Sequence, residues 1–118
     1  MKKDSDKSTR AFQELVRILG EAVQIGATRI GIEYEDRDLV VYFYSGNTGI
    51  GAPRIAEGLE QAVINEIYKR AGLARKPKGK FPVTLSGNDY EVTVEEYMSF
   101  DESAFNLTVM KRKKKPGE

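Results

Sequence analysis

The glycine-rich segment Gly46-Asn47-Thr48-Gly49-Ile50-Gly51 has residue types that could bind a phosphate group. Glycines at this spacing let backbone N–H groups converge on an anion, and a helix that starts just after them adds partial positive charge. The segment lacks the Gly-Lys-Ser/Thr ending that supplies a lysine and a magnesium-binding hydroxyl, and Pro53 removes a backbone donor. We therefore interpret it as a flexible turn rather than a nucleotide site.

A second candidate is the group of acidic side chains between residues 89 and 102. Glu91, Thr93 and Glu95 are spaced by two, so on a strand they share one face and could present paired carboxylates. They alternate with the apolar residues of the range 90–94, which is what a half-exposed antiparallel strand requires in any case. We interpret them as a solvated face.

The composition removes most other catalytic chemistry. The 118-residue chain contains no cysteine and no histidine, so it offers neither a thiolate nor an imidazole. Nucleophilic triads with histidine, zinc sites and haem ligation all depend on these groups. We therefore expect a protein that is not an enzyme and holds no metal or cofactor.

Charged residues are distributed in blocks, although the net charge is only +1. Residues 69–80 contain basic side chains and no acid, residues 81–110 contain acids and no base, and Lys111–Lys115 form an unbroken basic run. Basic segments of this kind could neutralise phosphates, which leaves an accessory nucleic-acid-binding role through 69–80 and 111–115 as an alternative function. Such binding weakens steeply with added salt.

No apolar run approaches the roughly 20 residues that a membrane-spanning helix needs, and the charged start does not resemble a signal peptide. We therefore expect no membrane insertion and a cytoplasmic location.

The spacing of apolar residues predicts one α+β domain over residues 9–111, flanked by a disordered segment 1–8 and a basic disordered tail 112–118. Helical periodicity runs from Thr9 to about Gly26, and again from Pro53 to Ala71. Residues 74–80 are predicted to be a loop that connects the second helix to the next strand. Alternation predicts five strands, over residues 29–34, 39–44, 81–85, 90–95 and 105–109. The order α-β-β-α-β-β-β indicates two helices packed on a mainly antiparallel five-stranded sheet.

The segment Ala27–Glu33, Ala-Thr-Arg-Ile-Gly-Ile-Glu, resembles the Ala-Ser-Asp-Ile-His-Ile-Glu signature of type II secretion and type IV pilus assembly ATPases. That signature opens their second N-terminal domain. The likeness continues in order over roughly residues 11–112, through the strand 39–46 and the Pro-x-Gly connection Pro77–Gly79. The family domain is a PAS-like α+β sandwich, so the resemblance implies that fold.

The sequence departs from the family at the residues that reach nucleotide phosphates. The family arginines of the hairpin correspond to Val41 and Phe43, the later strand arginine to Thr93, and the signature histidine to Gly31. Valine, phenylalanine and threonine cannot replace a planar guanidinium on phosphate oxygens. The resemblance therefore implies a degenerate stand-alone copy that acts in assembly and does not handle ATP.

These observations lead us to expect a protein-interaction or oligomerisation module, whose partner is another protein (a secretion or pilus ATPase motor is one possibility) or a second copy of the chain. Tyrosine is enriched in interface cores, and two tyrosines lie on the strand 39–44. The predicted interface residues are Tyr42, Tyr44, Arg70, Arg75, Lys76, Lys78 and Lys80.

Overall fold

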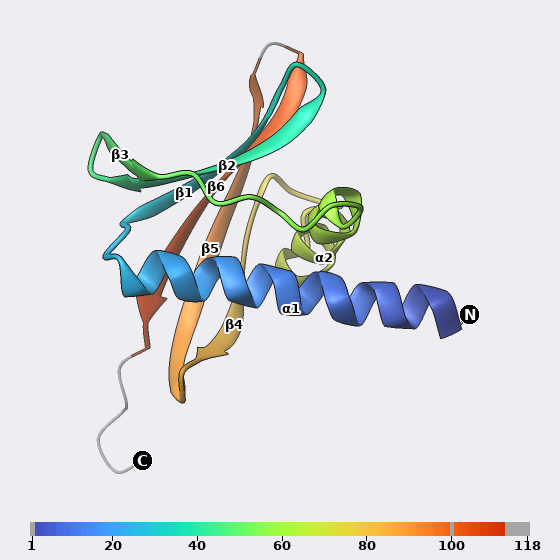
Figure 1. Cartoon of the computed structure of the whole chain (residues 1–118), viewed down its shortest axis with the longest axis horizontal. Helices are drawn as coiled ribbons and strands as arrows, with labels where there is room; N and C mark the ends of the chain where they lie inside the picture. The colour runs from blue at the N-terminus through green and yellow to red at the C-terminus, as the bar shows by residue number, and fades with distance from the viewer. Residues whose placement is uncertain (1, 100, 113–118) are drawn as a thin grey trace.

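The computed structural model describes residues 2–99 and 101–112, with residues 2–5 described by their backbone alone (Figure 1). The α+β class is confirmed, and no described helix is both long and apolar enough to cross a bilayer. The elements along the chain are α1 (Lys2–Gln24), β1 (Arg29–Glu35), β2 (Asp38–Ser45), β3 (Thr48–Gly51), α2 (Glu60–Ala71), β4 (Lys78–Leu85), β5 (Asn88–Ser99) and β6 (Glu102–Lys111).

The sheet has six strands rather than the predicted five, in the order β3-β2-β1-β6-β5-β4. Every neighbouring pair is antiparallel. The additional strand is β3, which pairs with Phe43–Ser45 at the end of β2. It forms because Gly46, with a φ of 59°, reverses the chain directly after β2. The glycine-rich segment is thus a hairpin with a short edge strand.

A tight turn sets the register between β1 and β2. Asp36 and Arg37 both have positive φ, 51° and 74°, as a two-residue type I′ turn requires. Glu35 therefore pairs with Asp38. The turn Ser86-Gly87 sets the register of β4 and β5 in the same way.

Helix α1 begins at Lys2, so residues 2–8, part of the segment 1–8 predicted to be disordered, are helical in the structure, and Met1 lies outside the described residues. Lysine has a favourable helix propensity. The Ser8 hydroxyl donates a hydrogen bond to Oε2 of Glu66 on α2, at 2.6 Å. This contact holds the first turns of α1 against the second helix.

The second helix begins at Glu60 rather than near Pro53. Between β3 and α2 the chain instead follows an irregular path, Ala52–Leu59, which we call the strap. Gly58 has a φ of 85° and therefore interrupts helical geometry one residue before the N-cap Leu59. Ile55 and Leu59, predicted to lie on a buried helical stripe, are buried from the strap.

Both helices pack on one face of the sheet, which we call the inner face (Figure 1). Apolar residues at alternate positions along the strands lie on this inner face. Helix α1 packs against them through the apolar stripe predicted from its sequence. The largest fully buried side chains are Phe105, Leu15, Ile18, Leu19, Ile30, Ile32, Ile67, Leu107, Val41, Val63, Val92 and Val94.

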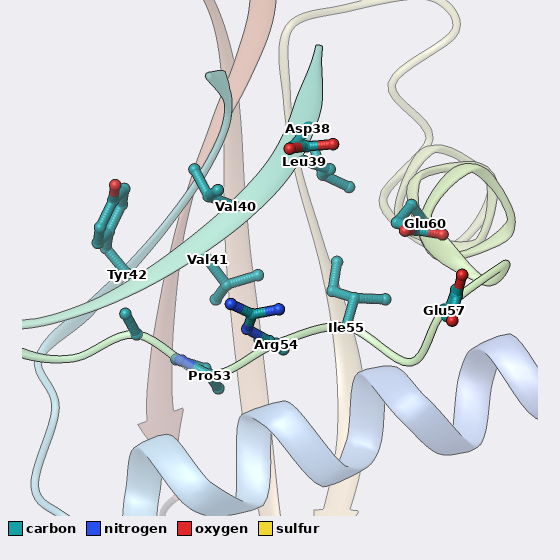
Figure 2. A pocket seen from close by; sticks show the side chains of 11 residues that line it. Asp38, Leu39, Val40, Val41, Tyr42, Pro53, Arg54, Ile55, Glu57 and Glu60 are labelled. Carbon is teal, nitrogen blue, oxygen red and sulfur yellow. The ribbon is translucent and has the colours of Figure 1, made fainter. Parts of the chain in front are cut away.

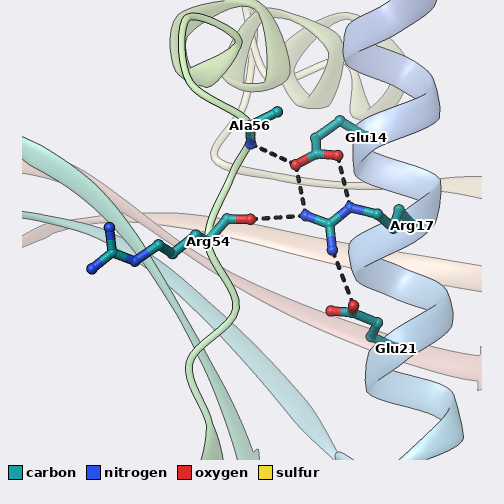
Figure 3. Close-up of polar contacts among 5 residues, drawn as sticks. All are labelled: Glu14, Arg17, Glu21, Arg54 and Ala56. Carbon is teal, nitrogen blue, oxygen red and sulfur yellow. Dashed lines mark hydrogen bonds and ion pairs between the residues drawn. The ribbon is translucent and has the colours of Figure 1, made fainter.

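A buried carboxylate ties the strap to α1 (Figure 3). Glu14 accepts a hydrogen bond from the Ala56 N–H at 2.6 Å. It also accepts two from Arg17, whose Nη2 donates as well to the Arg54 carbonyl oxygen at 2.8 Å. Hydrogen bonding from Arg17 holds the pKa of Glu14 below its usual range, although burial acts in the opposite direction. We call this group the strap clamp.

Strand β4 begins at Lys78, inside the stretch predicted to be a connection. Gly79 pairs with Val94 and lies directly against the end of α2: a Cβ atom at this position would come 1.7 Å from the Ala71 carbonyl oxygen. Helix and strand can approach this closely only because the residue is glycine.

At the other end of the chain, Arg112 donates its backbone N–H to the Asp89 carbonyl oxygen, at 2.9 Å, so the ordered part reaches one residue beyond the predicted boundary. The rest of the predicted basic tail, 113–118, lies outside the described residues.

The close approach at Gly79 generates a stability prediction. Gly79→Ala should lower the free energy of unfolding by about 3 kcal/mol, because the added methyl group forces α2 away from β4. In the matched control, Gly20→Ala, the added methyl group meets no atom within 4 Å. This change in α1 should raise the free energy of unfolding by about 0.5–1 kcal/mol. Urea unfolding followed by circular dichroism measures both. Equal effects of the two substitutions would contradict the packing at Gly79.

Candidate protein-interaction surface

The side of the sheet that faces away from α1 and α2, the outer face, carries the predicted tyrosines. The register brings Tyr42 opposite Gly31 and Tyr44 opposite Arg29 on β1, and Gly31 opposite Asn106 on β6. The outer face therefore consists of side chains at alternate positions of five strands. They are Arg29, Gly31 and Glu33; Val40, Tyr42 and Tyr44; Ala104, Asn106, Thr108 and Met110; Glu91, Thr93, Glu95 and Tyr97; and Lys78, Lys80 and Pro82.

Tyr44 is held in place by two contacts with β1. The Arg29 guanidinium lies over its ring, 4.0 Å from the ring centroid, and is itself fixed by a 2.9 Å hydrogen bond from Nη1 to Oδ1 of Asn106. In addition, Cε2 of the ring lies 3.2 Å from where a Cβ of Gly31 would stand. The absence of a side chain at Gly31 is therefore what lets the ring lie over β1.

Tyr42 is anchored at the next position of β2. Its hydroxyl donates a 2.6 Å hydrogen bond to Oε2 of Glu35, and its ring centroid lies 6.3 Å from that of Tyr44. The hydrogen bond to the Glu35 carboxylate raises the pKa of Tyr42 to about 12, because ionisation would place two negative charges together.

Tyr97 is a third aromatic residue of this surface, and it was not predicted. Burial raises its pKa, and the nearby Glu33 carboxylate acts in the same direction, while Arg29 opposes both. The spacing along β5 could have identified Tyr97, because every second residue of a strand lies on the same face, and Tyr97 follows Glu91, Thr93 and Glu95 in that series. The structure extends this strand to Ser99. Arg29, also missed, is the third residue of the signature segment 27–33.

The predicted basic residues do not join these tyrosines. Arg70 lies on α2, where its Nε donates to Glu66 at 3.1 Å and its guanidinium covers the Phe12 ring at 3.5 Å from the centroid. It therefore fastens the two helices together. Arg75 and Lys76 are exposed between α2 and β4.

Lys78 and Lys80 lie on the outer face, but on β4, four strand positions from β2, which is about 19 Å at ordinary strand spacing. Glu91 and Glu95 of β5 share one face, as predicted, and the two lysines form ion pairs with them. Lys78 Nζ lies 3.1 Å from Glu95 Oε2, and Lys80 Nζ lies 3.9 Å from Glu91 Oε1. Exposed ion pairs of this kind contribute little to stability, but they do offset the positive charge expected to attract phosphates.

The glycine-rich hairpin does not form a phosphate loop, because α2 begins only at Glu60, after the strap. Among residues 2–99 and 101–112, no three acidic side chains come together as a metal site.

Comparison of the sequence with protein-family models and with curated proteins finds no match. The organised feature of this part of the molecule is therefore the aromatic cluster of the outer face, Arg29, Tyr42, Tyr44 and Tyr97 together with the carboxylates beside it.

The Tyr42–Glu35 contact can be tested by titration. Glu35→Gln should bring the pKa of Tyr42 from about 12 back toward 10, because the neutral amide no longer opposes ionisation of the phenol. NMR titration of ring signals, assigned with a Tyr42→Phe variant, measures the change. As a control, the pKa of Tyr97, whose shift arises first from burial, should move far less. A Tyr42 pKa unaffected by the substitution would contradict the contact.

Proposed function

We propose that the protein is a non-catalytic protein-interaction module that contacts its partner through the outer face of the sheet. The observation that carries the proposal is the aromatic cluster: three tyrosines and an arginine, all half-buried, on the face that neither helix covers. Tyrosine and arginine are enriched in the cores of interfaces and supply most binding hot spots.

The cluster is ordered before any partner arrives. Arg29 is held by Asn106, Tyr44 lies against Arg29 and close to Gly31, and Tyr42 is held by Glu35. Ordering a side chain on binding costs about 0.5–1.5 kcal/mol, and a surface whose side chains are already fixed avoids most of that cost. Preorganisation therefore supports a binding role for this cluster.

The charge pattern favours a protein partner over a nucleic acid. Arg29, Lys78 and Lys80 all have polar or acidic neighbours, and Glu33 and Glu35 add negative charge beside the tyrosines. Nucleic-acid surfaces that stack bases on aromatic rings combine them with a positively charged groove. On this face the rings lie among carboxylates, which repel phosphate.

The resemblance to the secretion and pilus ATPase domain supports the same proposal. In that family the domain packs on a motor core, which is a protein–protein contact. Val41 and Phe43, which stand where the family has phosphate-binding arginines, are only 1% and 2% exposed in the core. This burial supports a module that contributes shape to an assembly without contributing to nucleotide binding.

Photo-crosslinking in the cells that make the protein tests the proposal. A photoreactive phenylalanine analogue placed at Tyr97 or Tyr44 should give discrete crosslinked protein species, because both positions lie in the aromatic cluster. The same analogue at Lys69, an exposed position on α2, should give none. The readout is the band pattern on a denaturing gel, with and without nuclease treatment.

Two outcomes would contradict the proposal. One is the same bands from Lys69 as from Tyr97, which would mean that the face is not selective. The other is crosslinked material that nuclease removes, which would identify a nucleic acid rather than a protein as the partner. Asn106→Ala, which releases Arg29, should weaken the crosslink from Tyr44 without unfolding the sheet.

A further inference from the structure

The first half of β2 is an open edge of the sheet. Strand β3 pairs only with Phe43–Ser45, so Asp38–Tyr42 has a neighbouring strand, β1, on one side alone. The chain cannot extend this pairing beyond Gly51, because Pro53 has no N–H to donate and the strap leaves the sheet toward α1. Exposed edges of this kind are templates for pairing with another chain.

The register identifies the backbone groups that the edge offers. Glu35 and Asp38 close a two-residue turn, so they form a hydrogen-bonded pair, and the bonds to β1 then recur at every second residue of β2. The N–H and C=O groups of Leu39 and Val41 consequently point away from β1. In the part of the chain that the structure describes, no strand pairs with them on that side.

A groove of about 670 Å³ runs along this edge, between β2 and the strap (Figure 2). Leu39, Val41 and Ile55 line its apolar part, with Pro53 beside them. Val41 and Ile55 are 1% and 8% exposed, so the half-buried Leu39 and Pro53 offer most of the apolar surface to an occupant. The strap clamp holds the other wall, since Glu14 and Arg17 bind the backbone of Ala56 and Arg54 from the α1 side. The strap is thus fastened to the helix and not to β2, which leaves room beside the edge.

Acidic side chains gather at one end of the groove. Asp38 lies at the start of β2, and Glu57 and Glu60 lie where the strap meets α2 (Figure 2). Within the described residues, none of the three forms an ion pair. Arg54 is the one basic residue of the lining.

We infer that this groove binds an extended segment of a partner protein, which adds to the open edge of β2 as a further strand. Main-chain hydrogen bonds to Leu39 and Val41 supply the pairing, and alternate side chains of the segment lie against the apolar wall. A lysine or arginine at one end of the segment lies over Asp38, Glu57 and Glu60. Tyr42 lines this groove and also belongs to the aromatic cluster, but Leu39, Val41 and Ile55 lie outside that cluster, so the site goes beyond the function proposed above.

Defined synthetic peptides test the inference on the full chain. The probe is an acetylated, amidated peptide of alternating valine and threonine with two lysines at one end; its matched partner carries glutamates in place of the lysines. The lysine peptide should bind at least about tenfold more tightly, because several charges contribute. NMR shift changes should centre on the amides of Leu39, Val41 and Ile55. A lysine peptide with N-methylated backbone positions should lose binding, since it cannot pair with the edge.

Variants of the protein make the test decisive. Glu57→Lys with Glu60→Lys should reverse the preference between the two peptides, while Asp89→Lys, an exposed change at the far end of the sheet, should leave it unchanged. Leu39→Pro removes the backbone N–H of Leu39, which points away from β1 and takes no part in the hydrogen bonds between β1 and β2. Without this donor on the open edge, binding of both peptides should be abolished. If Leu39→Pro fails to fold, the inference is tested by whether Glu57→Lys with Glu60→Lys reverses the preference between the two peptides.

The inference is overturned if the two peptides bind equally, if the N-methylated peptide binds as well as its parent, or if the shift changes lie elsewhere. Tyr97→Ser, which alters the outer face, should not change peptide binding. Failure of the groove and failure of the outer-face proposal are therefore distinguishable.

Discussion

The organisation of this molecule follows from one constraint: two helices must bury a six-stranded sheet, and both lie on the same face. The inner face is closed by α1, α2 and the residues of the strap. The outer face receives no such cover, so its own side chains have to shield the backbone. Tyr44 does so by lying over Gly31, with Arg29 stacked on its ring. The aromatic cluster is therefore a structural cover for the sheet whose side chains are fixed by contacts with one another and with their neighbours.

The same one-sided arrangement explains the path of the strap. Between β3 and α2 the chain has to cross from the sheet edge to the helical layer, and the strap clamp determines where it crosses. Glu14 is only 8% exposed, and it combines one backbone hydrogen bond with a bidentate pair to Arg17. A buried carboxylate that lost these partners would be strongly destabilising. Because the crossing is fixed at α1, the first half of β2 pairs with β1 on one side and has no described strand on the other.

Much of the fold could be predicted from periodicity. The alternation in β1 and β5 and the helical stripe of α1 indicated which side of each element faces the core, and the central residues of these patterns are buried: Ile30, Ile32, Val92, Val94, Leu15 and Leu19. The errors have physical causes. β3 is only four residues long, and two of them are glycines, which are depleted in strands. The strap buries Ile55 and Leu59 at helical spacing without being a helix, because Gly58 requires a left-handed backbone.

The candidate site was harder to predict than the fold. Tyr42 and Tyr44 were identified because they lie two residues apart on one strand, so local spacing places them together. Arg29, Asn106 and Tyr97 join them only through the pairing of β1 with β6 and of β6 with β5, which is not encoded in local spacing. Conversely, Arg70 and Lys78 are basic residues close in sequence, yet one binds Glu66 on the helical side and the other binds Glu95 on the outer face.

The central claim is that the outer face is the surface through which this protein meets another protein. Selective NMR line broadening of the labelled protein in an extract of its own cells measures this most directly. The account predicts that amide signals of Thr93, Tyr97 and Asn106 broaden on addition of the extract, while those of Gln61 and Lys69 on α2 stay sharp. Broadening centred on Arg75 and Lys76 that nuclease reverses would contradict it, as would an outer face whose signals are unaffected.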